Sequence, residues 1–178
     1  MNAEQFTLDV KSIDWHSFDD SPYYNPEQVP SALVSLFLAD EESKDGIDTS
    51  ENFSDMNIDL LLNAEIASNV LFAIGNNHRG TYYNAAQKAL PFIVQVALYG
   101  NHEVARNCAM NILIDLYYFC SDNGSVELER YVKSTIEKTI LDNRNSFIKF
   151  ALDFKRNELL IESLRSIVEE NERTSRDV

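Results

Sequence analysis

The segment His102–Cys120, with the sequence HEVARNCAMNILIDLYYFC, decides the fold of this chain. Polar residues recur every four positions, at Glu103, Asn107, Asn111 and Asp115. Almost all of the remaining residues are apolar. In a helix this spacing gives one narrow polar stripe on an otherwise apolar cylinder. Such a helix needs neighbours on most of its surface. We therefore expect it at the centre of a helical protein.

The chain before this segment contains three predicted helices. The first starts near Asn25, with Pro26 at the first helical position, where its missing N–H group is not needed, and it ends within 38–40. The second runs from about Asp55 to Ile74, with an apolar stripe at helical spacing. Gly75 suits the position just after its end.

The third helix follows a histidine- and tyrosine-containing segment. Asn84 and Gln87 have the spacing of a capping box. Pro91 falls on the polar face of this helix, so the carbonyl that it frees faces water, and it should bend the helix rather than end it. Gly100 and Asn101 are predicted to end this helix and to cap the central one.

Beyond Gly124 the chain has neither glycine nor proline, which favours uninterrupted helix. Apolar residues predict a fifth helix around 128–140, and one or two more within 146–154 and 158–168. The polar residues 171–178 form a tail.

Near the N-terminus, Phe6–Val10 alternates apolar and polar residues, and so short an alternation predicts only an extended arm. The expected fold is all-α, a single domain over 1–170 built as a HEAT- or ARM-like stack of antiparallel helix pairs. A weak internal repeat supports stacking: Ala32-Leu33 and Ala89-Leu90 stand 57 residues apart, each followed by a second helix.

The net charge of −14 is concentrated in the N-terminal third. Residues 1–60 hold fourteen acidic and two basic residues, which leaves −12, whereas residues 61–178 hold fifteen and thirteen, which leaves −2. This surface repels phosphate backbones and attracts basic partners, so we expect no direct contact with nucleic acid. Solubility alone is the other interpretation.

The expected location is the cytoplasm, without membrane association. The chain has no run of 18 apolar residues, and its first residues lack the pattern of a signal peptide. Cys108 and Cys120 lie twelve positions apart, about 18 Å along one helix, which is beyond the reach of a disulfide. We therefore expect both to be reduced core residues.

No catalytic, cofactor or metal site is predicted. The chain lacks a phosphate-binding glycine loop, an H-E-x-x-H motif and a C-x-x-C pair. The acidic connector after the first helix misses an EF-hand register by one residue, whether the loop starts at Asp40 or at Glu41. Asp115 could be a buried acid, although the polar stripe explains it. A metal could in principle be held by Asp14, His16, Asp19 and Asp20, but short Asp-rich segments are usually solvated turns.

Three segments resemble a family of small bacterial HEAT-like helical repeat proteins: DWHSF (14–18), YYNPEQVPSAL (23–33) and NNHRGTYYNAAQKALPFIV (76–94). In the third, the matching positions are His78, Gly80, Tyr83, Ala85, Ala86, Pro91 and Phe92. The resemblance extends over roughly 14–118. It implies an interaction scaffold, since some members are similar to immunity proteins of bacterial toxin systems, and it supplies no catalytic residues.

We therefore expect a non-enzymatic protein-binding module, without a cofactor. In its most specific form it is an immunity protein that neutralises a basic toxin, a nuclease domain. The residues expected to bind this partner lie on the acidic connector and at the repeat junction: Asp40, Glu41, Glu42, Asp45, Asp48, Glu51, His78, Arg79, Tyr82 and Tyr83. His78 can equally be a structural hydrogen-bonding residue. Two alternatives stay open, an adaptor without a toxin and a DNA-repair glycosylase-like enzyme, although the latter needs a basic groove.

Overall fold

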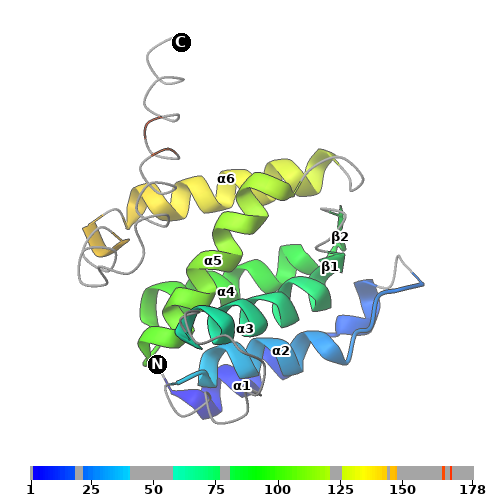
Figure 1. Cartoon of the computed structure of the whole chain (residues 1–178). Coiled ribbons are helices and arrows are strands. Elements are labelled where there is room, and N and C mark those ends of the chain that lie inside the picture. The colour runs from blue at the N-terminus through cyan, green and yellow to red at the C-terminus, as the bar shows by residue number, and fades with distance from the viewer. Residues whose placement is uncertain are drawn as a thin grey trace.

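The computed structural model describes residues 2–18, 22–40, 58–76, 81–120, 126–143, 145–147, 166 and 169, which are mostly helical (Figure 1). The predicted all-α class is therefore confirmed. None of the described helices has the length and apolar composition that crossing a membrane requires. The elements are α1 (Ala3–Lys11), the 3₁₀ helix η1 (Trp15–Phe18), α2 (Gln28–Leu38), α3 (Ile58–Ile74), β1 (Gly75–Asn76), β2 (Thr81–Tyr82), α4 (Ala85–Tyr99), α5 (Glu103–Phe119) and α6 (Val126–Asp142).

Helix α5 lies at the centre, as its narrow polar stripe predicts. It contacts α2, α3, α4 and α6, and Figure 1 shows it crossing between the α3–α4 layer and α6. Within the stripe, Glu103 and Asn111 are exposed, Asp115 is half-buried and Asn107 is buried. The remaining faces bury Val104, Ala105, Cys108, Ala109, Met110, Ile112, Leu113 and Leu116.

Helices that follow one another in the chain pack together. Helix α2 contacts α3, and α4 contacts α5, while α2 also reaches α4 and α5. These contacts join the two pairs into one hydrophobic core. Helix α1 extends this core by packing on α2, and α6 extends it by packing on α4 and α5. The predicted boundary of the domain at residue 170 falls outside the described residues.

The predicted extended arm at Phe6–Val10 is wrong, because this segment belongs to α1. Phe6 and Val10 stand one helical turn apart and are both buried, while Leu8 is 57% exposed. The ring of Phe6 stacks on Phe37 of α2, with 4.4 Å between centroids. Asn2 caps the helix, because its side chain accepts the N–H of Glu4 at 2.9 Å. Burial of one face decides the conformation here.

Helix α2 starts later than predicted, at Gln28 instead of Asn25. Pro26 lies in a turn before it, in which the Asn25 side chain accepts the Glu27 N–H at 3.2 Å. Pro30 is the proline inside the first helical turn, where N–H groups lack partners within the helix.

A short antiparallel ladder joins α3 to α4. Gly75 of β1 pairs with Tyr82 of β2, and the Tyr83 N–H donates to Ile74 O at 2.9 Å. Gly75 directly follows the last residue of α3, as predicted, but its backbone is not left-handed. It is glycine because there is no room for a side chain: a Cβ there would lie 2.6 Å from the Thr81 carbonyl oxygen.

Helix α4 continues through Pro91, so the proline does not end the helix, as predicted. Pro91 is exposed, which agrees with its predicted place on the polar face. The capping box at its start is not formed, because Asn84 has helical backbone angles and its side chain makes no capping hydrogen bond. Gly100 is the C-cap of α4, whereas His102, and not Asn101, is the N-cap of α5.

Helix α6 confirms the predicted fifth helix. It buries residues at four-residue spacing, namely Leu128, Val132, Ile136 and Ile140. A hydrogen bond of 3.0 Å from the Tyr117 hydroxyl to Glu137 Oε1 ties it to α5. Residues 145–147 are helical and Phe147 is buried, but most of the further helices predicted within 146–168 and the tail 171–178 lie outside the described residues.

Candidate functional site

An open cleft of about 490 Å³ lies between the η1 segment and α2. Its volume falls within the range of small-ligand sites in proteins. Its lining combines apolar walls with charged groups, and consists of Lys11, Ile13, Asp14, Trp15, His16, Pro26, Glu27, Pro30, Ser31 and Val34. We call it the η1–α2 cleft.

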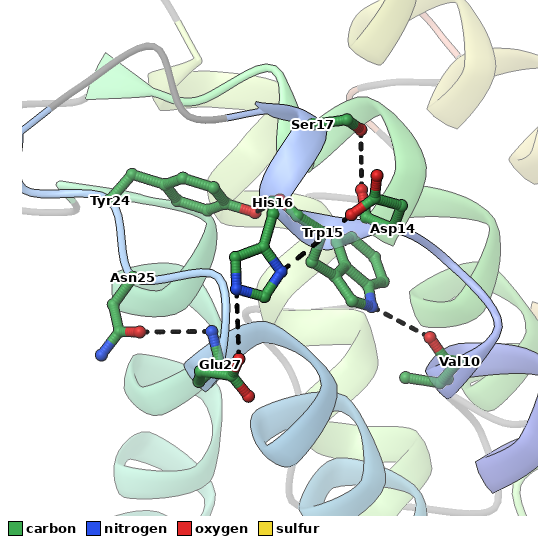
Figure 2. Close-up of polar contacts among 8 residues, drawn as sticks. All are labelled: Val10, Asp14, Trp15, His16, Ser17, Tyr24, Asn25 and Glu27. Carbon is green, nitrogen blue, oxygen red and sulfur yellow. Dashed lines mark hydrogen bonds and ion pairs between the residues drawn. The ribbon is translucent and has the colours of Figure 1, made fainter.

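Two buried hydrogen bonds fix the inner wall of the η1–α2 cleft (Figure 2). The Trp15 indole N–H donates to Val10 O of α1 at 2.9 Å, and the Tyr24 hydroxyl donates to Trp15 O at 2.8 Å. Trp15 is therefore held at both its side chain and its backbone, and α1, η1 and the segment before α2 are joined into one unit.

The outer wall is held by local hydrogen bonds around Glu27. Besides the bond from its N–H to Asn25, the Glu27 carbonyl accepts the Ser31 hydroxyl at 3.2 Å. Pro26 and Pro30 flank this residue, and each has a fixed φ. The position of Glu27 at the start of α2 is thus set by contacts of its backbone, while its side chain remains 76% exposed.

The charged groups of the cleft surround one histidine. His16 Nε2 lies 3.2 Å from Glu27 Oε1, and Nδ1 lies 4.0 Å from Asp14 Oδ1, so the ring stands between two carboxylates (Figure 2). All three side chains are at least 69% exposed, so water screens these contacts and they contribute little to stability. Among the described residues no group of three or more side chains is arranged to hold a metal ion.

A second set of polar side chains lies near the end of α5. It consists of Tyr82 of β2 with Asp115 and Cys120, which act on it electrostatically. The Tyr82 hydroxyl is buried and finds no hydrogen-bond partner among the described residues. Burial raises the pKa of Tyr82, and the negative charges of Asp115 and Cys120 add to this effect. Burial also raises the pKa of Asp115. Burial thus disfavours the charged forms of both Tyr82 and Asp115.

Both cysteines are free and buried, as predicted. Burial raises the pKa of Cys108 to about 12 and, together with the charge of Glu129, that of Cys120 to about 11. Since the thiolate is the nucleophile, two thiols that stay protonated at neutral pH are poor candidates for catalysis.

The residues predicted to bind a partner are only partly described. Asp40 is half-buried at the end of α2, while Glu41, Glu42, Asp45, Asp48, Glu51, His78 and Arg79 lie outside the described residues. Tyr82 is buried, so it does not meet the exposure that a surface anchor requires. Tyr83 is half-buried against Tyr24, with ring centroids 5.2 Å apart.

The η1–α2 cleft was missed from the sequence as a binding site. In the sequence, Asp14 and His16 indicate only a possible metal site together with Asp19 and Asp20, which lie outside the described residues. The available signal was the pair of segments DWHSF and NPEQVP, which carry most of the lining. A comparison of the chain with family models, with curated proteins and with solved structures finds no match.

Two tyrosine substitutions are expected to act in opposite directions. Tyr24→Phe removes the donor to the buried Trp15 carbonyl and should lower the free energy of unfolding by about 1–2 kcal/mol. Tyr82→Phe removes a buried hydroxyl that has no partner, and should leave stability unchanged or raise it by about 1 kcal/mol. Urea unfolding of both variants measures this. Equal losses would show that the Tyr82 hydroxyl is hydrogen-bonded in solution.

Proposed function

We propose that this protein is a non-enzymatic binding module for a basic protein, and that it acts as an immunity protein against a basic toxin. One observation carries the proposal: the acidic residues of the first helices are displayed on the surface. Glu4, Asp9, Asp14 and Glu27 are all exposed, and Lys11 is the sole lysine or arginine in residues 1–40.

Such a surface suits a partner that binds nucleic acid. A nuclease presents a cationic groove to the phosphate backbone, and an acidic protein can cover that groove. Long-range attraction also speeds encounter, to about 10⁸ M⁻¹s⁻¹ or more at low salt. An inhibitor that must meet its toxin before the toxin meets nucleic acid gains from a fast association rate.

The helical architecture supports a scaffold role. The contacts between α2 and α3 and between α4 and α5 support the proposal of a HEAT-like stack of helix pairs, and the repeated Leu33 and Leu90 are both fully buried. In such stacks the binding surface comes from exposed helix faces and connectors, while the buried residues serve packing. This division agrees with an acidic exterior around an apolar core.

The test begins with capture of a partner by the intact chain and with growth measurements. We expect the captured protein to be basic, to stop growth when it is expressed alone, and to be tolerated when this chain is co-expressed. A basic partner that is harmless alone supports an adaptor instead of an immunity protein. An acidic or neutral partner contradicts the electrostatic basis of the proposal.

Charge reversal should then slow association. Glu41→Lys, Glu42→Lys and Asp45→Lys together should reduce the association rate about tenfold at low salt and change the dissociation rate by less than about threefold. The control reverses the exposed acids Glu65, Glu127 and Asp142, which alters the net charge equally outside the acidic third. Equal slowing by the two variants would show that only net charge matters, and would place the interface away from the connector.

A further inference from the structure

We propose that the η1–α2 cleft binds the guanidinium group of one arginine side chain, with Asp14 and Glu27 as its anionic walls. This inference rests on the proposed function, because a basic protein is the source of that arginine. It goes further by naming the site and the chemical group that enters it.

The position of His16 shows which shape fits between the two carboxylates. The imidazole is a planar ring with nitrogen atoms on its edges, and these face Glu27 at 3.2 Å and Asp14 at 4.0 Å. A guanidinium group is also planar, carries five N–H donors and keeps its positive charge at all physiological pH values. It can therefore replace the weak contacts of the histidine with charge-assisted hydrogen bonds to both carboxylates.

The remaining lining suits the rest of an arginine side chain. Ile13, Trp15, Pro26, Pro30 and Val34 supply apolar surface beside the charged groups. Long basic side chains bury their methylene stems along such surface and keep the charged end near water. The flat faces of Pro26 and Pro30 also favour a planar cation over the compact ammonium group of lysine.

Hydrogen bonds hold the backbone on both sides of the cleft before binding. The hydrogen bonds of Trp15, Tyr24 and Asn25 fix both walls, and two prolines restrict the backbone around Glu27. Little ordering of the protein is then needed when a side chain enters, which favours affinity. The side chains of Asp14 and Glu27 are 77% and 76% exposed, so an incoming guanidinium group can reach both carboxylates.

One residue that lines the cleft is itself positively charged and repels a cation, so its substitution provides a discriminating test. Lys11 carries a positive charge at the edge of the cleft, at the end of α1. Its removal should strengthen arginine binding, which is a gain that misfolding cannot imitate. Loss-of-binding variants alone would not have this property.

Trp15 provides a direct readout, because it is the only tryptophan in the chain and its indole N–H gives a single resonance in a ¹H–¹⁵N spectrum. The probe is the peptide acetyl-Gly-Arg-Gly-amide, titrated into the whole protein. We expect a saturable shift of the indole resonance with a Kd of about 1–10 mM, as one side chain allows. The citrulline peptide, which has the same shape without the charge, should produce no saturable shift.

The variants assign the shift to named groups. Asp14→Asn and Glu27→Gln should each weaken peptide binding by about threefold or more, and Lys11→Gln should strengthen it by about twofold. Glu4→Gln and Glu65→Gln remove the same charge from exposed positions outside the cleft and should have no effect. A dispersed ¹H–¹⁵N spectrum in the absence of peptide shows that each variant is folded.

Several outcomes would overturn the inference: no saturable shift with the arginine peptide, an equal shift with the citrulline peptide, equal affinity for acetyl-Gly-Lys-Gly-amide, or equal losses in the cleft and control variants. The proposed function is judged separately by the captured partner. If a basic toxin binds the wild type and the Asp14→Asn/Glu27→Gln variant equally well, the proposed function stands and the cleft is not its arginine site. If the peptide binds as expected and the captured partner is acidic, the site stands and the proposed function fails.

Discussion

Leu113→Ala is expected to lower the free energy of unfolding by about 2–5 kcal/mol, the range for truncating a buried leucine. Leu113 is 1% exposed and lies on α5, which contacts four other helices. The substitution removes Cγ and its two methyl groups from the centre of the core and leaves a cavity. The surrounding helices can fill this cavity only by moving relative to one another, so little of the loss should be recovered.

Urea unfolding followed by far-UV circular dichroism measures this loss. The control is Asn111→Ala, two residues away on the exposed polar stripe of the same helix, which should change stability by no more than about 0.5 kcal/mol. A Leu113→Ala loss below about 0.5 kcal/mol would mean that α5 does not form the centre of the core. A large loss in the control would indicate that the polar stripe makes structural contacts.

The central part of the fold could be predicted because its pattern is long. In the seventeen residues of α5 the same polar spacing occurs three times, and the apolar spacing of α6 occurs equally often. Only one periodicity fits so many positions, and it also fixes which face is buried. The continuation of α4 through Pro91 could be predicted for the same reason, because the polar residues that share its face identify that face as exposed.

Short patterns led to the errors. Three apolar residues in Phe6–Val10 fit both a strand and one turn of helix, and only the packing of Phe6 on Phe37, which is distant in the chain, selects the helix. The start of α2 was misplaced because two prolines, Pro26 and Pro30, both suit a first turn, and the Asn25 turn decides between them. Helix ends depend on local hydrogen bonds that residue types alone do not specify.

The η1–α2 cleft could not be predicted, because it is formed by contacts between separate segments. Trp15 belongs to η1 and Glu27 directly precedes α2, and the hydrogen bond from Tyr24 to the Trp15 carbonyl links these two segments. Charge counting identified the acidic N-terminal third, which includes Asp14 and Glu27, but it could not show that these two carboxylates face the same histidine.

Gly75→Ala is expected to lower the free energy of unfolding by about 2–3 kcal/mol, near the upper end of the usual cost of overpacking. A Cβ at this position would lie 2.5 Å from Tyr82 Cδ1 and 2.6 Å from Thr81 O. The Tyr82 ring is buried and the Thr81 oxygen belongs to the backbone, so neither can move aside easily. Alanine also restricts the unfolded chain, which offsets about 0.4–1 kcal/mol of the loss.

A double-mutant cycle with Tyr82→Ala separates the two contacts. If the ring alone resists the new Cβ, Gly75→Ala should cost almost nothing once the ring is gone. We expect a substantial part of the cost to remain, because the contact with the Thr81 carbonyl persists in the Tyr82→Ala background. That remainder measures how closely β1 and β2 approach each other where α3 joins α4. If Gly75→Ala proves neutral in the wild-type background, this close approach is not required, and the junction is held by the α3–α5 and α4–α5 contacts instead.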